Sequence, residues 1–155
     1  MKGNKMAELK ERPTVNRYDM HEFLRDIGSI IRQVHAYNAT AEHPINSIIG
    51  ISRGGLIPAV YLSHYLNLPM RVVEYSTRDG MVGETSHAWL STVRNALVVD
   101  DIADSGRTLN YIQDVNPFLP TAVLIQKELS DHMATFHGKY ESGVSWVQFP
   151  WELAP

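Results

Sequence analysis

The order of apolar and polar residues predicts alternating helices and strands. After Asp19 an apolar side chain recurs every three or four residues, which predicts a helix with one apolar stripe. Asp19 and Glu22 have the spacing of a capping box at the start of this helix. The stripe consists of Met20, Phe23, Leu24, Ile27, Ile30, Ile31 and Val34. The short β-branched run at 47–51 then predicts a buried strand, and residues 56–66 predict a second helix.

Further apolar runs predict strands at 70–75, 96–99 and 121–126, with a helix that begins near Thr108. This alternation indicates right-handed βαβ units and therefore an α/β fold with a mainly parallel sheet. Residues 76–95 are polar, contain glycine and have no clear period, so they predict a long functional loop. Ligands of such sheets bind at the carboxyl ends of the strands, so the turns that follow the strands are the candidate site.

Composition restricts the kind of protein. A chain of 155 residues with 44% hydrophobic and 20% charged residues predicts a single globular domain over 15–155, preceded by a flexible arm at 1–14. The net charge of −3 argues against nucleic acid or a membrane surface as a partner. The chain contains no cysteine, and we find neither an apolar leader nor a membrane-spanning run. We expect a cytoplasmic protein.

The motif with the most chemistry runs from Val98 to Thr108. An apolar strand leads into Asp100 and Asp101, and a glycine-containing loop follows. Carboxylates at a strand end can accept hydrogen bonds from a ribose diol or hold Mg²⁺. The loop at 104–108 directs backbone N–H groups to one point at a helix N-terminus, which favours an anion. The alternative is a strand–turn–helix whose acids only cap the helix.

The whole string resembles the phosphoribosyl-diphosphate (PRPP) motif of the type I phosphoribosyltransferases. The resemblance implies that Asp100 and Asp101 contact the ribose hydroxyls and the metal, here Mg²⁺, while Asp104 lies beside N7 of the base as the catalytic acid or base. Ala103 is smaller than the aliphatic residue usual in the family. The residues that would cradle the 5′-phosphate are Ser105, Gly106, Arg107 and Thr108.

Ser52, Arg53 and Gly54 follow the first core strand. Arginine offers two parallel N–H donors to a phosphate, although such a segment is by itself most often an ordinary turn. The family carries its pyrophosphate-binding loop at this place. Ser-Arg-Gly-Gly followed by an aliphatic residue and proline is the form seen in bacterial xanthine–guanine phosphoribosyltransferases.

The family also uses a mobile hood after the second strand to exclude water, which corresponds to residues 76–95. The alternative is a surface loop without ligand contacts. The seven histidines lack metal-ligand spacing, and we expect His132 and His137 at the surface. Candidate contributors in the hood are Ser76, Thr77, Arg78, Asp79, Glu84 and His87.

Residues 127–152 resemble the base-binding region of the same branch. Lys127 would read the purine 6-oxo group, Trp146 would stack on the base, and Val147 and Gln148 would complete the pocket. Gln148 stands where the branch has an acid, which puts the family's base and metal preferences in doubt. Trp146 and Trp151 have an alternative as core or interface aromatics.

The resemblance implies a type I phosphoribosyltransferase fold, a twisted, mainly parallel sheet flanked by helices with a flexible hood and a small C-terminal base-binding region. It implies transfer of ribose 5-phosphate from PRPP to N9 of guanine, xanthine or hypoxanthine in purine salvage, with Mg²⁺ as cofactor. The family implies a homodimer or homotetramer. The alternatives are a regulator of the same fold that binds PRPP or a nucleotide, and a transferase for another base.

Overall fold

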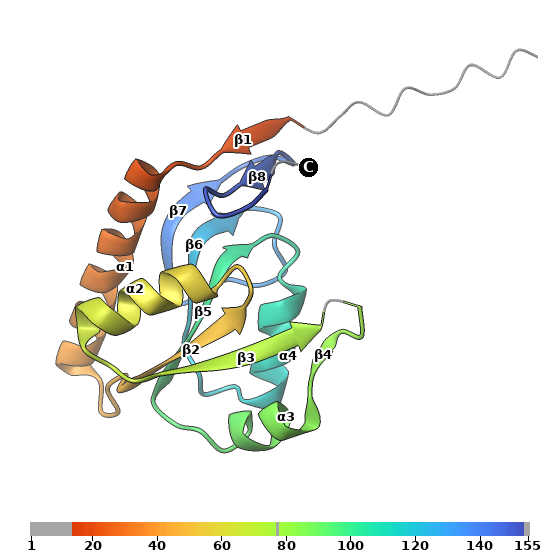
Figure 1. Ribbon diagram of the computed structural model, residues 1–155. Helices are drawn as coiled ribbons and strands as arrows, with labels where there is room; N and C mark the ends of the chain where they lie inside the picture. The colour runs from red at the N-terminus through yellow and green to blue at the C-terminus, as the bar shows by residue number, and fades with distance from the viewer. Residues whose placement is uncertain (1–13, 77, 154–155) are drawn as a thin grey trace, which may run out of the picture.

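The computed structural model describes residues 14–76 and 78–153. Helices and strands alternate from β1 to β3 and from β4 to β6, and the helices flank a central sheet (Figure 1). In chain order the elements are β1 (Val15–Arg17), α1 (Met20–Thr40), β2 (Ser47–Ser52), α2 (Leu56–Leu66), β3 (Met70–Ser76), β4 (Met81–Val82), α3 (Glu84–Leu90), β5 (Ala96–Ala103), α4 (Arg107–Val115), β6 (Thr121–Lys127), β7 (Phe136–Glu141) and β8 (Trp146–Gln148).

The central sheet has the strand order β4-β3-β2-β5-β6-β7. All of its neighbours are parallel except β4, which runs antiparallel to β3. Helices α1 and α2 cover one face, and α3 and α4 cover the other, so each face has its own apolar core. The predicted α/β fold with a mainly parallel sheet between helices is confirmed.

Helix α1 begins as its sequence predicts. Asp19 accepts a hydrogen bond from the Glu22 backbone N–H, and Glu22 accepts one from the Asp19 N–H, which completes the capping box. Of the predicted apolar stripe, Phe23, Ile27, Ile30 and Val34 are buried, whereas Met20 and Leu24 are exposed. The helix therefore packs along a narrower face than its sequence indicated.

The strand order reverses between β2 and β5: from β2 the chain adds strands on one side of the sheet, and from β5 it adds them on the other. Helix α2 connects β2 to β3 on one face, and α4 connects β5 to β6 on the other. In parallel sheets a crevice forms at the carboxyl ends of the two strands where the order reverses. The segment at 52–55 and the loop at 104–106 follow these two strands, so the fold brings both glycine-bearing turns to one edge.

Four strands, β1, β4, β7 and β8, were not predicted from the sequence. β7 adds a parallel edge strand to the sheet, and β1 pairs in parallel with β8 as a separate two-stranded sheet, with Asn16 opposite Val147. The proposed arm at 1–14 lies outside the described residues except for Thr14, whose carbonyl accepts a hydrogen bond from Trp146 N–H. Residues 15–17 belong to the fold because they pair with β8. The sequence pattern did not reveal this, because β8 lies near the opposite end of the chain.

The prediction of a structureless segment at 76–95 was wrong. It contains β4, which pairs with the end of β3, and helix α3. Only Leu90 of α3 is fully buried, so the helix has no apolar period that a sequence pattern would detect. Within the described residues, none of the helices combines the length and apolarity that crossing a bilayer requires.

Candidate active site

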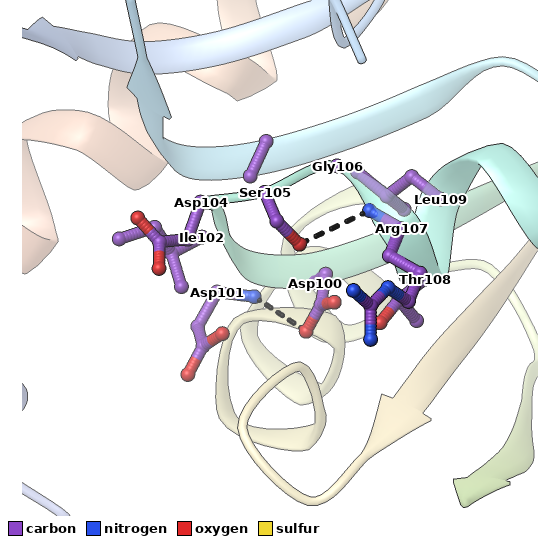
Figure 2. Close-up of a pocket in the computed structure, with 10 residues that line it drawn as sticks. Asp100, Asp101, Ile102, Asp104, Ser105, Gly106, Arg107, Thr108 and Leu109 are labelled. Atoms are coloured by element: carbon purple, nitrogen blue, oxygen red, sulfur yellow. Dashed lines mark hydrogen bonds between the residues drawn. The ribbon is translucent and has the colours of Figure 1, made fainter. Parts of the chain in front are cut away.

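A cavity of about 210 Å³ lies where β5 meets α4, lined by residues 100–109 (Figure 2). We expected Asp100 and Asp101 to follow the strand, but β5 continues to Ala103 because residues 100, 102 and 103 still pair with β6. Asp101 is buried and Asp100 is half-buried, with its carboxylate accepting a 2.9 Å hydrogen bond from the Asp101 N–H. The two acids are therefore fixed by the sheet.

The two adjacent carboxyl groups are electrostatically strained. Burial, with a further contribution from the charge of Asp101, raises the pKa of Asp100 well above its usual range. Burial also raises the pKa of Asp101, and the charge of Glu152 in the C-terminal turn adds to this. Two acids with raised pKa values form a site that lacks positive charge. A bound cation or hydroxyl donors would stabilise their ionised forms.

The loop after β5 is shaped for an anion. Gly106 has φ of +83°, a conformation that side-chain-bearing residues rarely adopt, and α4 begins at Arg107 directly after it. A Cβ at Gly106 would also collide with the backbone N of His132. Ser105 Oγ accepts a 3.4 Å hydrogen bond from the Arg107 N–H (Figure 2). The first turn of α4, whose backbone N–H groups have no acceptor within the helix, thus begins at the cavity beyond the carboxyl end of β5.

The segment after β2 packs directly against the acids. A Cβ on Gly54 would overlap the carboxylate of Asp101, and one on Gly55 would overlap the backbone at Val99 and Asp100. The peptide bond between Ser52 and Arg53 is cis, and the Arg53 side chain is exposed. The two predicted loops therefore meet at Asp101, as the topology requires.

The remaining predicted residues are distributed around this centre. Asp104 lines the cavity with an exposed side chain. In the hood, Ser76 Oγ donates to the Asp79 carboxylate at 2.7 Å, and both residues line a separate hollow of about 420 Å³ together with Glu84. Arg78 and His87 are exposed, and Thr77 lies outside the described residues. The hood residues are therefore not gathered around the 210 Å³ cavity.

The C-terminal region brings Lys127 and Trp146 to the carboxyl edge of the sheet. Trp146 is 53% exposed, Val147 is buried and Gln148 is half-buried. Lys127 is only 3% exposed, and its ammonium donates to the Ser145 carbonyl at 2.9 Å. Trp151 stacks on Phe149 and meets Phe23 edge-on, so its ring contributes to the core.

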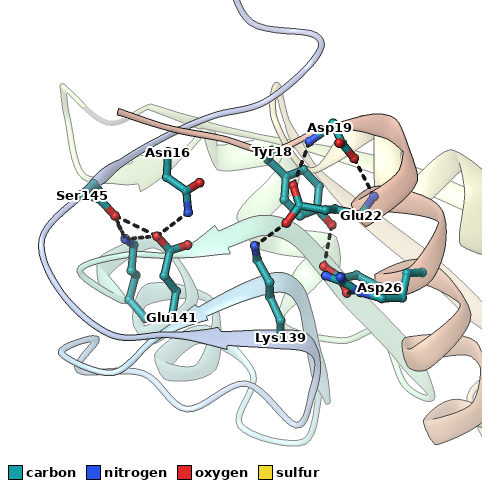
Figure 3. Close-up of polar contacts among 10 residues, drawn as sticks. Asn16, Tyr18, Asp19, Glu22, Asp26, Lys139, Glu141 and Ser145 are labelled. Atoms are coloured by element: carbon teal, nitrogen blue, oxygen red, sulfur yellow. Dashed lines mark hydrogen bonds and ion pairs between the residues drawn. The ribbon is translucent and has the colours of Figure 1, made fainter. Parts of the chain in front are cut away.

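Sequence reasoning missed the partners of Lys127. Glu141 lies 3.4 Å from the lysine ammonium and accepts hydrogen bonds from Asn16 and Ser145 (Figure 3). These residues come from β1, β7 and the segment before β8, which are the parts of the fold that the sequence pattern did not reveal. The alternation of Phe136, Gly138 and Tyr140 was the one available signal for β7.

The expectation that His132 lies at the surface was also wrong. It is 3% exposed, and its two ring nitrogens lie 2.9 Å from Asn110 Oδ1 and 3.1 Å from Thr121 Oγ1. An amide oxygen only accepts, so Nδ1 carries the hydrogen and Nε2 accepts from Thr121. The imidazole lies between the segment after β6 and helix α4, beside Gly106, and is therefore shielded from solvent.

Comparison with known proteins supports the family expected from the sequence. A xanthine-guanine phosphoribosyltransferase of Gluconobacter oxydans is 26% identical over 163 aligned positions, which span 100% of this chain and 93% of that protein. A purine phosphoribosyltransferase from Pyrococcus horikoshii superposes with a TM-score of 0.69 at 25% identity, covering 91% of this chain and 96% of the other. The fold is also similar to that of a hypothetical protein from Neisseria gonorrhoeae with bound ppGpp, with a TM-score of 0.69 at 21% identity over 92% and 91% of the chains.

The family model described as the phosphoribosyl transferase domain matches residues 15–152, which include the strands of both sheets, the acid pair and the turns at 52–55 and 104–106. The match extends from β1 through the C-terminal turn at Glu152 and so covers nearly all of the described fold. The chain therefore belongs to the phosphoribosyltransferase family.

Proposed function

We propose that this protein transfers ribose 5-phosphate from PRPP to N9 of a 6-oxopurine and releases pyrophosphate. The observation that carries the proposal is the packing of Gly54 against Asp101, because the segment proposed to bind pyrophosphate thereby lies against the acid pair proposed to bind ribose. The relatives named for xanthine, guanine or purine substrates support the choice of a purine.

In this reaction the C1′–O bond to pyrophosphate breaks and its electron pair leaves with the oxygen. The N9 lone pair forms the new bond to C1′, and the base loses a proton. The exposed carboxylate of Asp104 is the residue proposed to receive that proton. Arg53 and the N–H groups at the start of α4 would bind the two phosphate ends and hold C1′ in line with the base.

The donor set fits Mg²⁺. Asp100 and Asp101 offer two adjacent carboxylates, and because burial raises the pKa of both, a bound cation would stabilise their ionised forms. In the parts of the chain that the structure describes, no three histidine or acidic side chains are grouped to hold a metal. Mg²⁺ commonly takes one or two carboxylates and completes its shell with substrate oxygens and water. When bound with PRPP it would neutralise charge on the departing pyrophosphate.

The decisive experiment is a pyrophosphate-release assay with Mg²⁺, PRPP and each of guanine, xanthine, hypoxanthine, adenine and uracil. We expect turnover with at least one 6-oxopurine and little with adenine or uracil. Tight PRPP binding without turnover of any base would overturn the proposal and favour a regulator of this fold that binds PRPP or a nucleotide.

Lys127 is proposed to read the 6-oxo group of the base. Lys127→Met keeps most of the side-chain length and removes the donor, so KM for the base should rise by about tenfold or more while KM for PRPP changes little. Lys139→Met is the matched control, because Lys139 also pairs with a glutamate, Glu22, at 2.9 Å. Equal base KM values for the Lys127 variant and the control would remove Lys127 from the site.

A further inference from the structure

A buried polar cluster surrounds the lysine that is proposed to read the base. Lys127 ends β6 and Glu141 ends β7, and the two residues are register partners in the parallel pair. Asn16 of β1 and Ser145, which directly precedes β8, close the cluster from the other side. The Lys127 side chain is 3% exposed and that of Glu141 is 11% exposed, so their charges interact in a poorly solvated environment.

Most of the donor capacity of Lys127 is already used. One N–H donates to the Ser145 carbonyl at 2.9 Å. A second N–H can donate to Ser145 Oγ at 3.5 Å or to Glu141 Oε1 at 3.4 Å. These two oxygens are 2.8 Å apart, so they share one donor direction. An ammonium has three N–H groups, so one remains for a ligand. That geometry suits a single carbonyl oxygen.

Glu141 is held in its ionised form. Burial alone would raise the pKa of Glu141, but hydrogen bonds from Asn16 at 3.0 Å and from Ser145, together with the charge of Lys127, outweigh burial and lower the pKa. Its second oxygen, Oε2, is buried without a hydrogen-bond partner. The neighbouring cation on β7, Lys139, pairs with Glu22 and leaves Glu141 to Lys127. The Lys127–Glu141 pair therefore has no net charge.

We propose that Glu141 is a positioning and specificity-determining residue that cancels the charge of Lys127, so that the site favours neutral 6-oxopurines over anionic xanthine. The inference rests on the proposed function, with Lys127 reading the 6-oxo group. Xanthine is the most acidic of the three oxopurines and is partly anionic near neutral pH, whereas guanine and hypoxanthine are neutral there. A lone lysine would attract the anion, and a lysine paired with a carboxylate does not.

The first test measures kcat/KM for xanthine and guanine with the wild-type protein and with Glu141→Gln, which keeps the shape and one acceptor oxygen but removes the charge. We expect the xanthine-to-guanine ratio to rise by about fivefold or more, the effect of one charge across a partly solvated distance. KM for PRPP should stay the same. Glu128→Gln is the matched control, because it removes the same charge from an exposed position next to Lys127 in the chain, and it should leave the ratio unchanged.

The wild-type protein supplies a second test that needs no variant. As pH rises through the ionisation of xanthine, the xanthine-to-guanine ratio should fall, because the anion that forms is rejected by the neutral pair. In Glu141→Gln the fall should be weaker or reversed. A third measurement asks whether the effect is one of charge. In a Lys127→Met background the Glu141 carboxylate is uncompensated and should repel the xanthine anion, so the ratio should fall below that of the wild type, and adding Glu141→Gln should restore it.

The outcomes separate the two proposals. Wild-type protein that turns over no oxopurine overturns the proposed function and this inference together. Turnover of guanine with a xanthine ratio that rises with pH in the wild type, or that Glu141→Gln leaves unchanged, overturns the inference and leaves the proposed function standing. A ratio change of equal size in Glu128→Gln would also overturn it, because the effect would then be a general one of net charge.

Discussion

At the scale of single residues, the acid pair trades stability for a binding site. Asp100 and Asp101 lie side by side at the end of a buried strand, and burial raises the pKa of both. Asp101→Asn removes one charge, so without Mg²⁺ and PRPP the free energy of unfolding at pH 7.5 should rise by about 1 kcal/mol. Turnover should fall by about a hundredfold or more, because the variant loses a proposed ligand of Mg²⁺ and of the ribose.

Thermal melts in EDTA and kinetics with saturating Mg²⁺ measure these two effects on the same samples. Asp114→Asn is a suitable control, because Asp114 lies exposed on α4 and should change neither quantity. If Asp101→Asn melts at or below the wild-type temperature in EDTA, the acids are not a source of strain. Asp100 and Asp101 were recognisable in the sequence by type and order, but the strain was not, since it depends on burial that only the packed sheet creates.

At the scale of elements, His132 joins the segment after β6 to α4 and to the start of β6. Burial lowers the pKa of His132, so the folded protein binds its proton less well than the unfolded chain, whose histidines titrate near about 6.5. The stability that the neutral ring contributes is therefore full above that pH. It is lost as pH falls through the lower pKa of the folded state. Protonation also removes the Nε2 acceptor that faces Thr121.

We expect the melting temperature of the wild type to fall more steeply between pH 7 and pH 5 than that of His132→Gln. The lowered pKa of the half-buried His137 contributes to both proteins, so the difference between the two profiles belongs to His132. Parallel profiles would contradict the prediction. The backbone of His132 packs closely against Gly106, leaving no room for a Cβ there. Loosening the His132 segment at low pH should therefore disturb the loop at Gly106 and weaken PRPP binding, which titration calorimetry can measure.

The elements that the sequence predicted well are those whose signal is local. The strands β2, β3 and β6 and the helix α2 were placed within one residue, because each is rich in apolar residues and is bounded by polar residues, glycine or proline. β1 and β8 have only three residues each and pair across nearly the whole chain, and β7 alternates with polar residues such as Lys139, so none of the three is an apolar run. The cluster around Lys127 is built from these strands, which is why the lysine was predictable and its partners were not.

At the scale of the whole molecule, one helix is more apolar than its position in a single chain requires. Helix α2 is apolar around its circumference, with Leu62 and Ala59 in the core. A helix that is apolar on every side is usually buried on every side. Its outer side nevertheless carries Ile57, Val60 and Tyr65 at exposed positions, and Val72 of β3 is exposed as well.

We propose that this outer side of α2, defined by Ile57, Val60 and Tyr65, packs against a second copy of the chain, in keeping with the homodimer or homotetramer that the family resemblance implies. Val60→Glu places a charge in the middle of this surface, and the assembly should dissociate into monomers because an unpaired carboxylate resists desolvation. Light scattering at micromolar concentration measures the mass. Leu129→Glu is the control, because Leu129 is 72% exposed on the segment after β6, and it should leave the mass unchanged. A wild-type protein that scatters as a monomer at all concentrations would contradict the proposal. If Val60→Glu is monomeric and still releases pyrophosphate at the wild-type rate, each site is complete within one chain. We expect this outcome, because the two turns proposed to bind phosphate, at 52–55 and 104–106, lie on a single sheet.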